Sequence, residues 1–172
     1  NSLMATSQPA ILGDLQKYQW YVHMSRTEGA DLGVIKQALK DAQADAAAQG
    51  VNFCILLGPT LAADLGIETD SDFQPYPGYE SPDGKVAKGT QEELLLWLHH
   101  ADKDLIWEGQ HTARRALAGH MAVARETPCF IYKNSLDLTG HIDGTGNPEP
   151  EDQKARGIID AGQPGEGGSY SG

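Results

Sequence analysis

A lone carboxylate stands among glycines in the stretch GHIDGTGNP, residues 140–148. Gly140 and Gly144 permit positive φ angles and leave room for a flat ligand to approach the backbone closely. Asp143 would then project with little steric cover, and a carboxylate held in this way can act as an acid–base group over a bound planar molecule. The alternative is an ordinary Asx turn without chemistry.

Three common ligand-binding motifs do not match this loop. A dinucleotide fingerprint needs a third glycine where the chain has Glu149, and Pro148 and Pro150 oppose the helix that should follow. A phosphate-binding P-loop would end in Gly-Lys-Ser/Thr, which is missing. A calcium-binding EF-hand that began at Asp143 would need glycine and glutamate where Pro148 and Lys154 stand.

The other residues with reactive side chains lack a chemical pattern. His99 and His100 are neighbours on an expected strand, so their side chains point to opposite faces and cannot chelate one metal ion. We expect structural roles for these two histidines and also for His111 and His120, which flank an expected helix. The two cysteines, Cys54 and Cys129, lie in apolar runs and are expected to be buried. Three tryptophans could relay electrons, but core packing is the favoured interpretation (Trp20, Trp97 and Trp107).

Hydrophobic periodicity predicts the elements that must position Asp143. Alternating or continuous apolar residues predict strands, whereas apolar residues at helical spacing between Asp or Gly caps predict helices. The expected order is strand 15–26, helix 30–50, strand 51–59, a short helix at 60–66, a long loop at 67–89, strand 93–101, helix 102–119 and a strand or bent strand pair at 120–134, broken by Pro128.

This β-α-β, long loop, β-α-β order predicts an α+β, ferredoxin-like split βαβ fold: an antiparallel sheet with helices on one face. Residues 7–147 are expected to form this domain. Residues 148–172 are rich in glycine, proline and charge and predict a connector toward a missing second half.

Composition excludes several classes of function. The 172 residues carry a formal charge of −11, which opposes binding to nucleic acid or to an anionic membrane surface. The chain has no run of 18 apolar residues and no signal-peptide pattern, so a cytoplasmic protein that spans no membrane is expected.

The motif GHIDGTGNP resembles the G-x-x-D-G motif of the dye-decolorising peroxidases, in the bacterial form GFVDGTENP. The resemblance extends to SQPAILGDLQKYQWYVHM, to TQEELLLWLHHADKDLIWEGQ and to GEGGSYSG, and so covers most of residues 7–172.

Members of this family are haem peroxidases built from two ferredoxin-like halves, in which a distal arginine assists the motif aspartate and a histidine ligates the iron. The resemblance implies that Asp143 lies over the distal face of haem and moves a proton between the oxygens of hydrogen peroxide. It also implies that Gly140 and Gly144 shape the loop, that Thr145 and Asn147 hold it near the haem edge, and that His141 stands beside the aspartate on the distal side.

The chain departs from the family pattern after the motif. Residues 145–172 contain no histidine, Arg156 comes too early to match the distal arginine, and Gly146 replaces the usual glutamate. We therefore expect the proximal haem ligand to be lacking, with no tight haem binding and no turnover by this chain alone.

Two functions follow. The first is the N-terminal half of a dye-decolorising-type peroxidase, which oxidises dyes or phenols with hydrogen peroxide. The alternative is a haem-free ferredoxin-like binding or assembly module. In either case we expect a homodimer that covers the sheet face opposite the helices, because two helices can cover only one face.

Overall fold

A computed structural model describes residues 5–142 and 146–170 of the chain. Helices and strands alternate along it: β1 (Tyr18–Arg26), α1 (Leu32–Ala48), β2 (Asn52–Leu57), α2 (Pro59–Asp64), β3 (Tyr79–Glu80), β4 (Val86–Ala87), β5 (Leu94–His100), α3 (Lys103–Ala116), β6 (Met121–Phe130) and α4 (Pro150–Gly157). No helix among the described residues is long and apolar enough to cross a membrane.

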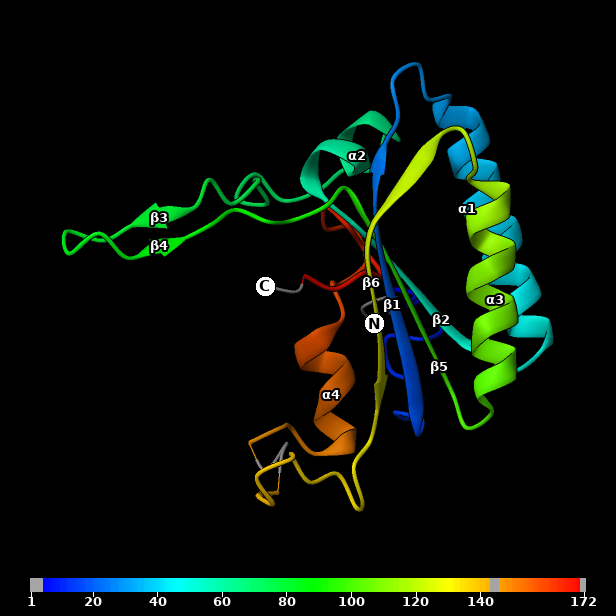
Figure 1. Cartoon of the computed structure of the whole chain (residues 1–172), viewed down its shortest axis with the longest axis vertical. Coiled ribbons are helices and arrows are strands. Elements are labelled where there is room, and N and C mark those ends of the chain that lie inside the picture. The colour runs from blue at the N-terminus through cyan, green and yellow to red at the C-terminus, as the bar shows by residue number, and fades with distance from the viewer. Residues whose placement is uncertain (1–4, 143–145, 171–172) are drawn as a thin grey trace.

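The main sheet has four strands in the order β2-β5-β1-β6, and every neighbouring pair is antiparallel. Helices α1 and α3 pack together on one face of this sheet, while α4 lies on the other side (Figure 1). The strand order and the two helices on one face confirm the predicted ferredoxin-like fold.

The core lies between the sheet and the two helices. Val22 and Met24 of β1 face it together with alternate leucines of β5 (Leu94, Leu96 and Leu98), all 0–1% exposed. Ile35 of α1 and Ile106 of α3 close the core from the helix side. The two-residue spacing of the buried leucines matches a pleated strand, which confirms that residues 93–101 form a strand.

The helices begin and end where their capping residues predict. The Asp31 carboxylate accepts hydrogen bonds from the N–H groups of Gly33 and Val34 and so caps α1. Asp102 caps α3 in the same way, through the N–H of Asp104. Gly119 follows α3 at φ = 82°, a conformation in which a side chain would be strained.

The prediction that Pro128 breaks the last strand is wrong. Strand β6 continues through Pro128, which pairs with Trp20 of β1. The proline is tolerated because β6 is an edge strand, where one side of the backbone needs no partner. The irregularity lies further back: the register shifts between His23 and Met24, and Ala124 is the extra residue of a β-bulge.

The expectation that prolines oppose a helix after the motif is also wrong. Pro150 occupies the first turn of α4, where its missing N–H would have no helical partner in any case. The tail, residues 158–170, then packs back onto the beginning of the chain: the N–H of Gln8 donates to the carbonyl of Gly167, and Ile158 is 9% exposed. The described part of the tail is therefore folded against the rest of the chain. That residues 148–172 connect to a second half stays a prediction.

The long loop contains a two-stranded hairpin. We call residues 67–92 the arm, because β3 and β4 carry it away from the body of the molecule (Figure 1). A turn closes its tip, where the Ser81 hydroxyl and an ion pair between Lys85 and Asp83 hold the chain.

Candidate functional site

The motif loop, residues 136–148, leaves the sheet after β6 and leads to α4. Its first part is a compact turn. The Asp137 carboxylate accepts hydrogen bonds from the Thr139 N–H at 2.8 Å, the Thr139 hydroxyl and the His141 N–H at 3.2 Å. Leu136 and Ile142 form an antiparallel bridge across the turn. A defined turn therefore delivers the chain to the position before Asp143.

Only some of the residues predicted for the site can be placed. Gly140 has φ = 94°, which confirms the predicted need for glycine there. His141 and Asn147 are both exposed. Asp143 lies outside the described residues, as do Gly144 and Thr145, so their predicted roles stay predictions.

Large apolar side chains are exposed around this loop. Leu138 is 79% exposed, Ile142 69% and Phe130, at the end of β6, 59%. Leu138 and Ile142 belong to one turn, and large apolar side chains exposed in this way are typical of a surface that another body covers. The motif loop thus offers an open apolar surface, which fits one wall of a site for a planar apolar group.

Two grooves found in the described residues lie away from the motif loop. Both are shallow and follow β2, one of about 370 Å³ against α1 and one of about 230 Å³ beside residues 9–10. Among residues 5–142 and 146–170, no three His, Cys, Asp or Glu side chains gather to hold a metal ion.

A polar and aromatic cluster lies on the sheet face opposite α1 and α3. The Tyr21 hydroxyl and the Trp97 Nε1–H both donate to the Gln19 side-chain oxygen, at 2.8 and 3.1 Å, and the two rings stack at 5.6 Å. Burial, and the nearby Cys129, raise the pKa of Tyr21. Sequence reasoning missed this cluster, although its residues alternate with the core positions of β1 and β5.

His99 ends this cluster and is fully buried. Its Nδ1 accepts a hydrogen bond from the Gln16 N–H at 3.3 Å, so the other ring nitrogen carries the proton. Burial, and then the neighbouring His100, lower the pKa of His99, which keeps the ring neutral. The predicted structural role therefore fits His99.

The remaining sequence candidates fall in separate places. The His120 ring accepts from the Asp31 N–H at 3.0 Å next to the α1 cap, and His111 stacks on Trp107 at 4.8 Å. Trp107 is 49% exposed, so the prediction of core packing is wrong for this residue, which lies on the outer side of α3. Cys54 is buried as predicted, whereas Cys129 is half-buried; both are free thiols.

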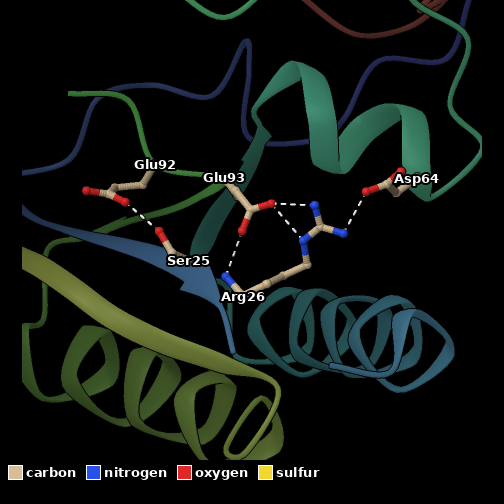
Figure 2. Close-up of polar contacts among 5 residues, drawn as sticks. All are labelled: Ser25, Arg26, Asp64, Glu92 and Glu93. Atoms are coloured by element: carbon tan, nitrogen blue, oxygen red, sulfur yellow. Dashed lines mark hydrogen bonds and ion pairs between the residues drawn. The ribbon is translucent and has the colours of Figure 1, made fainter. Parts of the chain in front are cut away.

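A charged network that the sequence did not reveal closes the base of the arm (Figure 2). Arg26 at the end of β1 binds Glu93 through its backbone N–H at 2.7 Å and through its guanidinium, which also reaches Asp64 at 2.6 Å. Beside it, the Ser25 hydroxyl donates to Glu92. Because Asp64 precedes the arm, Glu92 ends it and Glu93 follows it, the network ties both roots of the arm to the sheet.

Comparison with solved structures defines the fold further. A DypB variant from Rhodococcus jostii in complex with heme has a TM-score of 0.80 at 20% identity over 94% of this chain and 54% of its own. The dye-decolorizing protein from V. cholerae has a TM-score of 0.74 at 20% identity, with 89% and 53% covered. The encapsulated DyP-type peroxidase from Mycobacterium smegmatis has a TM-score of 0.66 at 20% identity, with 84% and 48% covered.

The chain spans about half the length of these proteins. No protein-family model matches it, and no curated protein does. The class defined by the fold is a ferredoxin-like α+β domain. More closely, the chain has the fold of one half of a Dyp-type peroxidase, consistent with the N-terminal half.

Proposed function

We propose that this chain is the N-terminal half of a Dyp-type haem peroxidase, and that the whole protein oxidises dyes or phenols with hydrogen peroxide. The observation that supports the proposal most is the coincidence of two independent features. The fold matches half of a Dyp-type peroxidase over up to 94% of the chain, and the family-like motif follows the last strand of that fold.

In this proposal the chain supplies the acid–base group of the peroxide step. Asp143 takes the proton from one oxygen of hydrogen peroxide and returns it to the other as the O–O bond breaks. Gly140 and Gly144 shape the loop, and His141, Thr145 and Asn147 line the edge of the bound cofactor. Haem, when bound, supplies the two electrons that reduce the peroxide.

The exposed apolar surface of the motif loop supports a shared haem site. Leu138 and Ile142 would contact the planar face or edge of the cofactor, and the remaining walls and the axial histidine would come from outside this chain. We therefore propose that the chain alone does not bind haem tightly, because it lacks the axial ligand, and has negligible peroxidase activity.

A visible spectrum of the purified chain with added haemin tests this proposal. We expect a broad, weak Soret band, and a sharp band only when the remaining half is present in the same chain or added in trans. A sharp Soret band from the chain alone that shifts in His141→Ala would contradict the proposed division of the site, because the chain would then provide its own ligand.

The alternative function is a haem-free ferredoxin-like module that binds a small planar molecule or serves in assembly. The stacked Tyr21 and Trp97 rings on the sheet face favour it, since they join aromatic faces to the polar side chain of Gln19. A protein that carries both halves and shows no haem absorbance and no peroxide-dependent dye oxidation would favour this module.

A further inference from the structure

We propose that the groove between α1 and the edge strand β2 binds a medium-chain monocarboxylate, with its hydrocarbon tail on the groove floor and its carboxylate at Lys36 and Lys40. This α1–β2 groove is separate from the motif loop, and no described residue of that loop lines it. The inference therefore goes beyond the proposed haem chemistry and does not depend on it.

The floor of the α1–β2 groove is apolar. Five aliphatic side chains line it, from α1, from β2 and from the chain after α2 (Leu39, Ile55, Leu57, Leu65 and Ile67). Leu39 is buried, whereas Ile67 is 42% exposed, so the floor runs from the core to the surface. The free volume of about 370 Å³ lies at the small end of the range for ligand pockets, which suits a short hydrocarbon tail.

The amide side chains of the groove already have partners. The Gln8 Nε2 donates to the Ile55 carbonyl at 3.1 Å, and the Gln8 Oε1 accepts from the Ile55 N–H at 2.7 Å, so this side chain closes the edge of β2. The Gln43 Nε2 donates to the same Gln8 oxygen at 2.9 Å. Because these amides bind the strand and one another, they hold the groove in shape and leave recognition of a charged ligand to the lysines.

Lys36 and Lys40 give the groove a positive rim in a chain of formal charge −11. They are four residues apart on α1 and so lie on one face of the helix, where like charges repel. Both are exposed, and neither forms an ion pair in the described part of the chain. A ligand that relieves this repulsion and also covers the floor needs a negative charge and an apolar tail, and a fatty carboxylate has both.

Titration of the purified chain with octanoate, followed through the amide chemical shifts in NMR spectra, tests the site. We expect saturable shifts confined to residues 36–43, 55–57 and 65–67. From butanoate to decanoate, each added methylene should lower the Kd about threefold to fourfold until the floor is covered. 1-Octanol has the same tail without the charge and should bind at least about threefold more weakly than octanoate.

Charge reversal separates the contribution of the lysines from that of the floor. The double variant Lys36→Glu, Lys40→Glu should weaken octanoate binding at least about fivefold and leave octanol binding unchanged, whereas Lys103→Glu on α3 is the matched control and should change neither. Ile67→Asp should weaken the binding of both ligands. Val34→Asp, at a similarly exposed apolar position of α1 that does not line the groove, should weaken neither.

Four results would overturn the inference. Shifts that lie elsewhere, or that do not saturate in the millimolar range, would show that the groove does not bind such acids. Octanol binding as tight as that of octanoate, or octanoate binding that survives the double lysine reversal, would show that the lysines do not recognise the carboxylate. If dilution of the chain alone shifts the same amides and octanoate does not, the groove is a contact with a second copy.

Discussion

At the scale of single residues, the carboxylate of the motif carries the proposed chemistry. In the protein with both halves, Asp143→Asn should slow the reaction with hydrogen peroxide about a hundredfold or more, because an amide cannot accept and return the proton. The haem spectrum should stay nearly unchanged, since Asp143 is not proposed as an iron ligand. Stopped-flow absorbance measures both. A rate equal to that of the parent protein would reduce Asp143 to a residue that only shapes the loop.

The two thiols make a second prediction at this scale. Burial raises the pKa of Cys54 to about 11, so only about one molecule in a thousand carries the thiolate at pH 8. Cys129, on the edge strand β6, is half-buried. We expect iodoacetamide at pH 8 to modify Cys129 well before Cys54, as mass spectrometry of the digested protein would show. Equal labelling would mean that β2, at the other edge of the sheet, exposes its buried thiol as readily as β6 exposes Cys129.

At the scale of helices and strands, the sequence predicted the elements that are marked by residues within them or directly beside them. The periodicity of residues 93–101 is ambiguous between helix and strand, and strand β5 was predicted correctly because a clear helical pattern follows it; α3 was predicted by its cap at Asp102. Pro128 and Pro150 misled the prediction because the effect of a proline depends on its surroundings. An edge strand tolerates it, and so does the first helical turn. The network around Arg26 joins segments far apart in sequence, so no local pattern could reveal it.

That network makes a prediction about pH and stability. Burial tends to raise the pKa of Glu93, but hydrogen bonds from the Arg26 guanidinium and backbone outweigh it and lower this pKa. A lowered folded-state pKa stabilises the protein above the unfolded pKa, and this contribution disappears as the pH falls through the folded pKa. We expect Glu93→Gln to cost about 1–2 kcal/mol at pH 7, after allowance for partial exposure.

Urea denaturation at pH 7 and at pH 3.5 measures this difference. The parent protein and Glu93→Gln should approach each other in stability as the pH falls, because the contribution of the Glu93 carboxylate is lost on the way down through its lowered folded-state pKa. Asp83→Asn is a suitable control, because Asp83 forms an exposed ion pair at the tip of the arm, far from the sheet. A cost for Glu93→Gln that stays the same at both pH values would contradict the electrostatic account.

At the scale of the whole molecule, the second sheet face is less bare than the sequence implied. The tail and α4 lie on that side (Figure 1). The Gln16 N–H also donates to the His99 ring there. The arm projects away from the body of the molecule and does not cover the sheet (Figure 1). Among the described residues, large apolar side chains are exposed at the motif-loop end (Phe130, Leu138 and Ile142). No pattern in the sequence could predict this, because it depends on which segments fold back.

This apolar end leads to the last prediction, the homodimer. The exposed apolar side chains favour association of two copies through this end, because identical surfaces can cover one another across a two-fold axis. The formal charge of −11 on each copy opposes it, and salt screens that repulsion. We therefore expect a monomer–dimer equilibrium at micromolar concentration whose dimer fraction rises between low salt and 0.5 M NaCl.

Light scattering on three proteins decides whether the contact is where we place it. Ile142→Asp should give a monomer at both salt concentrations, because it puts a charge into the apolar contact. Tyr79→Asp, a matched change at an equally open position on the arm, should dimerise like the parent chain. If Tyr79→Asp abolishes the dimer and Ile142→Asp does not, the arm is the contact. A parent chain that stays monomeric in high salt would show that the exposed residues of the motif loop await the other half of the protein rather than a second copy.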